Sequence, residues 1–227
     1  AYDNTTNQFP SYGAGIACEL SYAVIGGNTI EENEILNDFD GSGAGIYCLN
    51  SMPLIIGNRI ARNQAEYGPA VYAWASTPLI VGNTIESNSM YVRMPLFTGA
   101  AEGAVSIHLA DDALVEGNRF VGNTAGTGAG VYFSAFRAGR IQNNLFLANR
   151  AYDPTAFGGM GGGLYVMATT DATSAIQVVH NTFVGNVASN LFQEMGGGMA
   201  YTLVPPATNL VIANNLIVSN SSGLYQT

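Results

Sequence analysis

A short motif, Asn-x-(Ile/Phe)-x-x-Asn, recurs seven times along the 227 residues of the chain. Successive copies begin 25 to 37 residues apart. In a repeat of this period each unit buries its apolar residues against its neighbours, so we expect a single cooperative domain over residues 1–227. The asparagines that bound the copies are Asn28 and Asn33, Asn58 and Asn63, Asn83 and Asn88, Asn118 and Asn123, Asn144 and Asn149, Asn181 and Asn186, and Asn215 and Asn220.

A second element precedes each motif and consists of glycines followed by alternating apolar residues. It occurs at 13–18, 43–48, 68–73, 103–107, 128–133, 161–166 and 196–201, and an eighth copy starts at 223. The apolar period of 2 and the Gly/Asn/Pro punctuation indicate short strands rather than helices. In the unit at 41–63 we expect strands at Ile46–Cys48 and Leu54–Ile56 and a third ending at Asn63.

Three short strands per turn predict an all-β fold, a right-handed parallel β-helix (solenoid) of about seven to eight coils. Alternate residues of each first strand should point inward, as in the pairs Ile46 and Cys48, or Val131 and Phe133. Coils about 4.8 Å apart give a rod of roughly 34 Å. The two asparagine files should form structural ladders along the corners, because each amide can donate and accept along the stack.

Charged residues are only 10% of the chain, the net charge is −9 and all seven basic residues are arginine. An acidic chain without a basic patch argues against binding to nucleic acid and to anionic lipid. No apolar run reaches the length of a membrane-spanning helix, so we expect no direct membrane span.

Tyr47, Tyr72, Tyr132, Tyr165 and Tyr225 share one outward position of the first strand, interrupted by Ala17 and Ala200. Stacked tyrosines stabilise neighbouring strands, which is one explanation. An exposed aromatic strip also suits sugar rings, since tyrosine keeps a polar tip in water. We therefore take Tyr47, Tyr72, Tyr132 and Tyr165 as candidate ligand-binding residues.

The extra length of the longer units falls beside the glycine-led strand, in inserts at 34–42, 89–101, 150–160 and 187–195. These segments should lie along one edge of the rod. They either fold over its surface or, together with the tyrosine face, present a surface to a polysaccharide or protein partner.

Cys18 and Cys48 occupy equivalent inward positions of consecutive coils. Their Cα atoms should be roughly 5 Å apart, within the range of a disulfide. Parallel, in-register Cβ vectors do not obviously give the required dihedral angle, so we favour two buried free thiols.

Few residues suggest chemistry beyond structure. Asp38 and Asp40 resemble the start of a calcium loop, but the twelfth position is Leu49 rather than a bidentate glutamate, which leaves Ca²⁺ as a weak candidate and no other cofactor. Polysaccharide hydrolysis needs two carboxylates at a defined separation. The best acid–base cluster for such an enzyme is Asp111 and Asp112 with Arg137 and Arg140, expected one coil above.

The glycine element paired with (Ile/Phe)-x-x-Asn resembles bacterial secreted right-handed β-helix repeat proteins. Phe120–Asn123, Phe146–Asn149 and Phe183–Asn186 are also similar to repeats of the chlamydial polymorphic outer-membrane adhesins, although Gly-Ala-Gly or Gly-Gly-Gly departs from their first motif. The resemblance covers nearly the whole chain and implies a bacterial extracellular or cell-surface setting. Because 151–153 repeats 1–3 and a coil starts at 223, we expect a segment of a longer protein with further coils at both ends.

These observations favour a non-catalytic surface module that binds glycan or protein. The alternatives are a β-helix polysaccharide lyase or glycoside hydrolase, and a passive spacer or filament component, because one fold hosts many functions.

Overall fold

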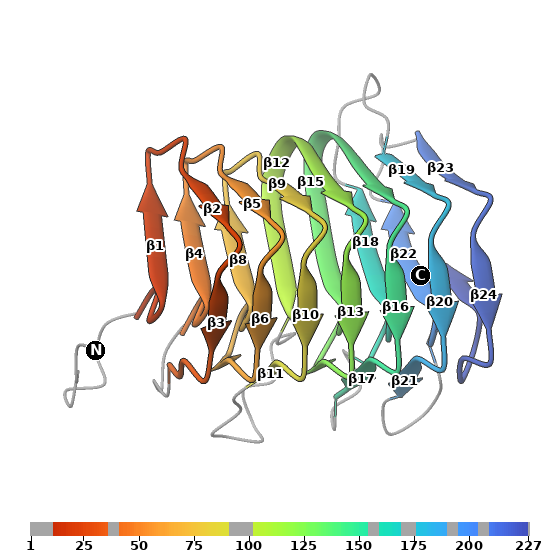
Figure 1. The fold of residues 1–227 in the computed structure, drawn as a ribbon. Helices are drawn as coiled ribbons and strands as arrows, with labels where there is room; N and C mark the ends of the chain where they lie inside the picture. Colours follow the sequence, from red (N-terminus) through yellow and green to blue (C-terminus); the bar gives the residue numbers. More distant parts are fainter. Residues whose placement is uncertain are drawn as a thin grey trace.

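The computed structural model describes residues 11–35, 41–90, 102–153, 159–168, 176–189, 195–203 and 209–226. All the secondary structure of these residues is β-strand, labelled β1 to β25. The strands wind into successive coils that stack along one axis, with the N-terminal and C-terminal coils at opposite ends (Figure 1). All strand pairs are parallel, so the fold is a parallel β-helix, as the repeat predicted.

The first face of the solenoid contains the glycine-led strands. In spatial order they are β1 (Ile16–Glu19), β4 (Ile46–Leu49), β8 (Val71–Trp74), β12 (Val105–Glu116), β15 (Val131–Gln142), β18 (Leu164–Ala168), β22 (Met199–Leu203) and β25 (Leu224–Gln226). The second face contains β2 (Val24–Gly26), β5 (Leu54–Ile56), β9 (Leu79–Val81), the second halves of β12 and β15, β19 (Ile176–Val179) and β23 (Leu210–Ala213).

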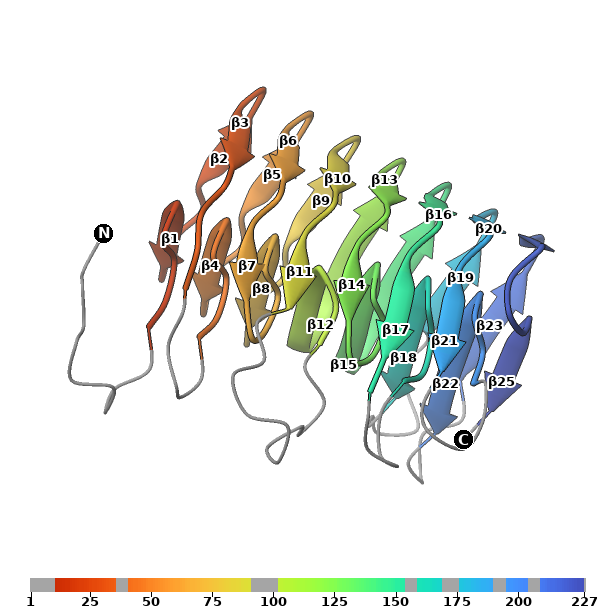
Figure 2. The same cartoon turned by 90° about the horizontal axis from the view of Figure 1, so that it is seen from below.

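The third face is the sheet formed by the asparagine motif. It contains β3 (Thr29–Glu31), β6 (Arg59–Ala61), β10 (Thr84–Glu86), β13 (Arg119–Val121), β16 (Leu145–Leu147), β20 (Thr182–Val184) and β24 (Leu216–Val218). Seen from below, this sheet and the first face lie on separate sides of the coil (Figure 2).

Two features depart from three strands per coil. A fourth, short strand follows the second asparagine in five coils: β7 (Gln64–Ala65), β11 (Ser89–Met90), β14 (Thr124–Ala125), β17 (Arg150–Tyr152) and β21 (Val187–Ser189). The buried alanines Ala125, Ala151 and Ala188 pack together beneath it. In addition, β12 and β15 each run for 12 residues through the corner between the first two faces. The earlier coils break there at Pro53 and Pro78, which cannot donate to a strand ladder.

The core is a set of in-register files. The predicted inward residues of the first face, Ile46 and Cys48, Val71 and Ala73, Val131 and Phe133, and Leu164 and Val166, are all fully buried. On the third face the inward file changes from isoleucine to phenylalanine along the axis. The rings of Phe120, Phe146 and Phe183 stack nearly parallel, with centroids 4.8 and 4.6 Å apart. Each coil therefore buries the apolar surface of its neighbours.

Both asparagine ladders form as predicted. The Nδ2 of Asn123 donates to Asn149 Oδ1 at 2.9 Å and to the carbonyl of Ile85 at 2.9 Å, and its Oδ1 accepts from the backbone N–H and Nδ2 of Asn88. In the other ladder Asn58 makes the equivalent hydrogen bonds, with Asn83, Ile25 and Asn28 as its partners. Each amide thus satisfies buried polar groups of two neighbouring coils.

The residue before each ladder asparagine turns the corner in the left-handed region. Glycine has this conformation at Gly57, Gly82 and Gly122, and other residues adopt it elsewhere, as at Arg62 with φ of 53°. Glycine is common at this position because it pays no steric cost there.

A serine ladder lies along the corner between the first two faces in the first three coils. Ser21 N–H donates to Ser51 Oγ at 3.1 Å, and Ser51 N–H donates to Ser76 Oγ at 3.0 Å. This serine ladder was not among the features predicted from the sequence.

Candidate functional site: the aromatic face

The predicted tyrosine file lies on the outer side of the first face. The strand register aligns Tyr47 with Tyr72, and Tyr132 with Tyr165. The rings of Tyr47 and Tyr72 are stacked with centroids 5.9 Å apart, and those of Tyr132 and Tyr165 are stacked at 5.5 Å. Tyr12 extends the file at its N-terminal end and stacks on Tyr47 at 4.7 Å.

The file has a gap at Ser106, whose side chain is too small to bridge Tyr72 and Tyr132. His108, two residues further along β12, fills it. Its imidazole lies 5.2 Å from the ring of Tyr72 and 5.2 Å from that of Tyr132. His108 Nε2 lies 2.5 Å from Glu102 Oε2, and both residues are nearly buried. The pair makes the aromatic column continuous, and sequence analysis missed it because His108 and Ser106 belong to different outward files.

Trp74, the one tryptophan of the chain, lies at the end of β8 beside this column. Its ring stacks on His108 with centroids 5.2 Å apart and on Tyr72 at 6.4 Å. It is nonetheless 40% exposed. The signal for Trp74 in the sequence was its place two residues after Tyr72, on the same side of the strand.

Exposure divides the face into two parts. Tyr132 and Tyr165 are buried, at 7% and 6% exposure, and the hydroxyl of Tyr165 hydrogen-bonds with Thr202 at 2.6 Å. Tyr47 and Tyr72 are half-buried, and Tyr12 is exposed. Tyr225, at the other end of the file on β25, is half-buried as well. The accessible rings around Trp74 lie over β1, β4 and β8, and we call Tyr12, Tyr47, Tyr72 and Trp74 the aromatic face.

Burial raises the pKa of Tyr72 well above its usual value of 10.0, and the nearby Glu102 carboxylate raises it further. Burial, with a smaller effect of Tyr12, also raises the pKa of Tyr47. A phenolate is disfavoured where water is excluded. These rings consequently remain neutral at physiological pH.

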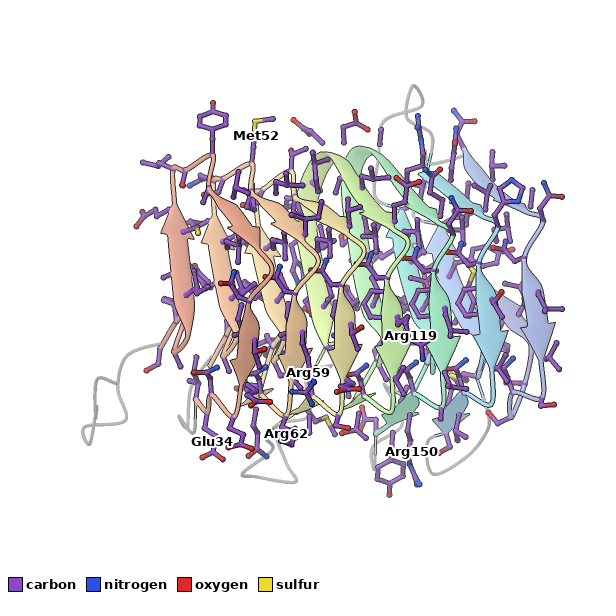
Figure 3. All side chains as sticks on the ribbon, viewed as in Figure 1. Glu34, Met52, Arg59, Arg62, Arg119 and Arg150 are labelled. Carbon is purple, nitrogen blue, oxygen red and sulfur yellow. The ribbon has the colours of Figure 1, made fainter. Side chains whose placement is uncertain are left out.

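The arginines with described side chains lie on other parts of the coil. Arg59 on β6 and Arg119 on β13 belong to the third face (Figure 3). Arg59 pairs with Glu31 and Glu86, and Arg62 pairs with Glu31 and Glu32. Among the described residues, the aromatic face therefore has no arginine, and the carboxylates of Glu19 and Glu102 lie near Tyr47 and Tyr72 respectively.

The other predicted site residues fall in several places. Asp38 and Asp40 lie outside the described residues. Asp111 and Asp112 are exposed on β12, and Arg140 is exposed on β15, where it pairs with Leu114. No ion pair joins Arg140 to either aspartate in the described part of the chain, and the side chain of Arg137 lies outside it.

No group of three or more His, Cys, Asp or Glu residues suited to a metal ion occurs among the described residues. Nor do they form any helix long and apolar enough to cross a membrane. Most of the predicted insert surface, including 91–101 and 154–158, lies outside the described residues.

The two cysteines lie in register on β1 and β4 and are both free and buried, in agreement with the interpretation favoured from the sequence. Burial raises the pKa of both thiols, more strongly for Cys48, so neither is a reactive thiolate at neutral pH.

A family model described as "Right handed beta helix region" matches residues 3–227. The chain belongs to the right-handed β-helix family. Comparisons of this β-helix with curated proteins and with solved structures each found no match. The family establishes the architecture and leaves the ligand to be argued from the surface of the β-helix itself.

Proposed function

We propose that this β-helix is a non-catalytic extracellular or cell-surface module that binds a polysaccharide through the aromatic face. The polysaccharide lies along the outer surface of the module and is not enclosed by it. The stacked coils supply the rigid support, and the rings supply the contacts.

The observation that carries this proposal is the exposure of Trp74. Trp74 lies on β8, which is paired with β4 and β12, and its ring stacks on Tyr72 and His108. Even so, 40% of the residue remains accessible to solvent. A large aromatic ring left exposed in a rigid frame contributes little to folding and is typical of a binding surface. A pyranose ring has an apolar C–H face that stacks on such a side chain.

The arrangement of the rings favours an extended ligand. Tyr12, Tyr47 and Tyr72 come from successive coils and stack with centroid separations of 4.7 and 5.9 Å along the axis. A glycan chain lying along this axis meets an aromatic side chain at every coil. The contacts repeat, so affinity rises with ligand length through many weak interactions.

A hydrolase of the usual kind requires two carboxylates on either side of the scissile bond. Glu102, the carboxylate that acts on Tyr72 and Tyr132, is nearly buried and hydrogen-bonded to His108, so it is not free to act beside a scissile bond. For this reason binding, rather than turnover, is the function we propose.

The test is calorimetric titration of the protein with neutral and uronic-acid polysaccharides, with product analysis on the same samples. Trp74→Ala should weaken binding at least about tenfold, the equivalent of about 1.4 kcal/mol. Tyr152→Ala is the matched control, since Tyr152 is 38% exposed but lies on β17. Equal binding by Trp74→Ala and the unmodified protein, or release of oligosaccharide products, would contradict the proposal.

A further inference from the structure

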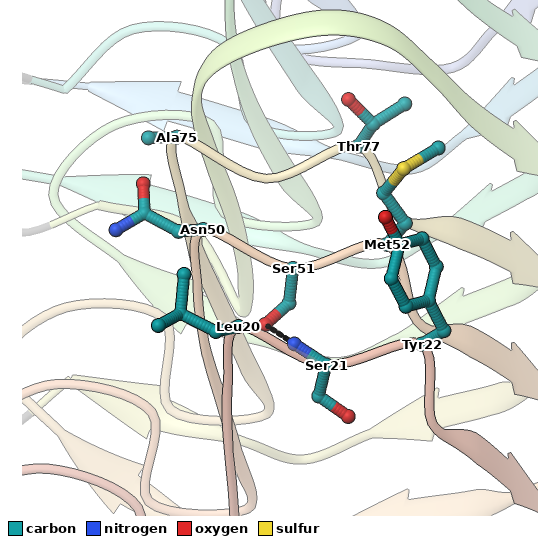
Figure 4. A pocket seen from close by; sticks show the side chains of 8 residues that line it. All are labelled: Leu20, Ser21, Tyr22, Asn50, Ser51, Met52, Ala75 and Thr77. Carbon is teal, nitrogen blue, oxygen red and sulfur yellow. Dashed lines mark hydrogen bonds between the residues drawn. The ribbon is translucent and has the colours of Figure 1, made fainter.

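A hollow of about 320 Å³ lies at the corner next to the aromatic face, where the first three coils turn from the first face to the second. Tyr22 and Met52 lie along one side and Leu20 and Asn50 along the other, with Ser51 between them (Figure 4). Ser21 of the first coil, with Thr77 and Ala75 of the third, completes the lining. The volume falls at the lower end of the range for small-molecule sites.

The backbone explains why side chains stand out at this corner. Leu20, Asn50 and Ala75 turn in the left-handed region, with φ of 48°, 48° and 46°. The serine ladder beneath satisfies the backbone, since Ser51 Oγ donates to the carbonyl of Leu49 at 2.8 Å and accepts from Ser21 N–H. The backbone at the bottom of the hollow is therefore held in place by the serine ladder, without hydrogen bonds from the side chains above it.

The walls are exposed to an unusual degree for large apolar residues. Leu20 is 75% exposed, Tyr22 is 79% exposed and Met52 is 54% exposed. These side chains bury little surface in the fold, so they contribute little to its stability. An exposed tyrosine ring and a polarisable thioether beside a hollow are suited to contact with the face of a ring.

Polar groups with unused hydrogen-bonding capacity border the same hollow. Within the described part of the chain, no hydrogen bond is recorded for the side-chain amide of Asn50 or the hydroxyl of Thr77. An amide both donates and accepts, as does a sugar hydroxyl. The lining includes no charged side chain, which disfavours a uronate or sulfate group.

The hollow continues the aromatic face. Trp74 is followed directly by Ala75 of the lining, and Leu49 is followed directly by Asn50. We infer that the hollow is a second binding subsite that takes an uncharged pyranose residue, either a branch or the end of a glycan whose main chain stacks on the aromatic face. The inference rests on the function proposed above.

The experiment uses neutral β-1,4-linked hexasaccharides of glucose, mannose and xylose as probes and hexagalacturonate as the charged comparison. Asn50→Gly removes the amide and keeps a residue that accepts the left-handed backbone. Asn214→Gly is the matched control, because Asn214 has φ of 55° at a corner of the last coils. Loss of one hydrogen bond should weaken binding of the best neutral probe about fivefold to tenfold in Asn50→Gly and leave it unchanged in Asn214→Gly.

A fluorescent reporter tests directly whether the sugar binds at this corner. In a Trp74→Phe, Tyr22→Trp variant, which keeps an aromatic ring at position 74, the single tryptophan lines the hollow. At probe concentrations where calorimetry shows that this variant binds, its emission should change on addition of the neutral probe and not of hexagalacturonate. Circular dichroism and a thermal melt confirm that the variants fold.

The outcomes separate the two proposals. If no probe binds the unmodified protein, both fail. If Trp74→Ala weakens binding while Asn50→Gly does not and the corner reporter is silent, the aromatic face stands and the subsite is overturned. If the reporter responds to hexagalacturonate as strongly as to the neutral probes, the assignment to an uncharged sugar is wrong.

Discussion

His108 and Glu102 lie with Nε2 and Oε2 2.5 Å apart in the outer column of the first face, in the space that Ser106 leaves between Tyr72 and Tyr132. The carboxylate holds the imidazole between the two rings, and Trp74 rests on the imidazole in turn. The aromatic face is thus joined through this pair to the buried rings of Tyr132 and Tyr165.

Removing the imidazole should loosen this column. His108→Ala leaves the nearly buried Glu102 carboxylate without its partner and removes one of the two ring contacts of Trp74, so we expect a loss of about 2–3 kcal/mol in the free energy of unfolding. Glu102→Gln keeps a hydrogen-bonding group and should cost less. Urea unfolding measures both. An unchanged midpoint for His108→Ala would show that the pair does not support the column.

The asparagine ladder should be strongest in the middle of the stack. Asn123→Ala removes the acceptor of Asn88 and the donor to Ile85 and Asn149, all within a fully buried ladder, and should cost about 3 kcal/mol in urea unfolding. Asn33→Ala in the first described coil should cost less, because Asn33 is only partly buried. Equal losses at both positions would mean that the ladder does not act coil by coil.

Gly139 makes room for the ring of Phe133. A Cβ atom at position 139 would lie 2.2 Å from Phe133 Cζ, so Gly139→Ala should destabilise the fold by about 1–3 kcal/mol. Phe133→Leu should lose stability by itself but relieve part of the Gly139→Ala penalty when the two are combined. Strict additivity in this double-mutant cycle would rule out the steric explanation.

The ion pairs of the third face predict a pH dependence. Hydrogen bonds and charges from Arg59 and Arg62 hold the pKa of Glu31 below its usual value of 4.5. Glu31 therefore binds protons less readily in the folded chain than in the unfolded one, and its stabilising effect is present above pH 4.5 and is lost as the pH falls through the lowered pKa.

Thermal melts of the protein and of Glu31→Gln measure this effect. The difference between them should be largest at neutral pH, shrink below pH 4.5 and shrink also in about 1 M salt. Glu19→Gln serves as the control, because no ion pair of Glu19 is recorded in the described residues. A difference that is constant from pH 7 to pH 2 would contradict the assignment.

The solenoid could be predicted because its determinants are local and repeated. Each asparagine motif fixes a corner, and the period of 2 fixes which residues face inward, as Ile46 and Cys48 do. The fourth strands could not be predicted, since two or three residues such as Gln64–Ala65 are too short to show a period. The alignment of the tyrosines could be predicted, because it depends only on the register of the paired strands.

Which residues make up the site could not be predicted from the sequence, because this depends on how the side chains are arranged in three dimensions. Ser106 aligns with Tyr72 and Tyr132 and leaves a gap in the tyrosine file, and only the direction of the His108 side chain shows that the column continues. Burial of Tyr132 and Tyr165 also depends on what surrounds the strand rather than on the strand itself. For the same reason Tyr47 and Tyr72 are more accessible than Tyr132 and Tyr165, a difference that a repeated sequence position does not reveal.

The central claim is that the aromatic face binds a glycan, and the emission of Trp74 tests it most directly. Titration of the intact protein with neutral β-1,4-linked hexasaccharides should give a saturable change in Trp74 fluorescence, and Tyr72→Ala should raise the dissociation constant at least about tenfold. Trp74 emission that stays constant for every neutral and uronic-acid glycan tried, or a dissociation constant that Tyr72→Ala leaves unchanged, would contradict it.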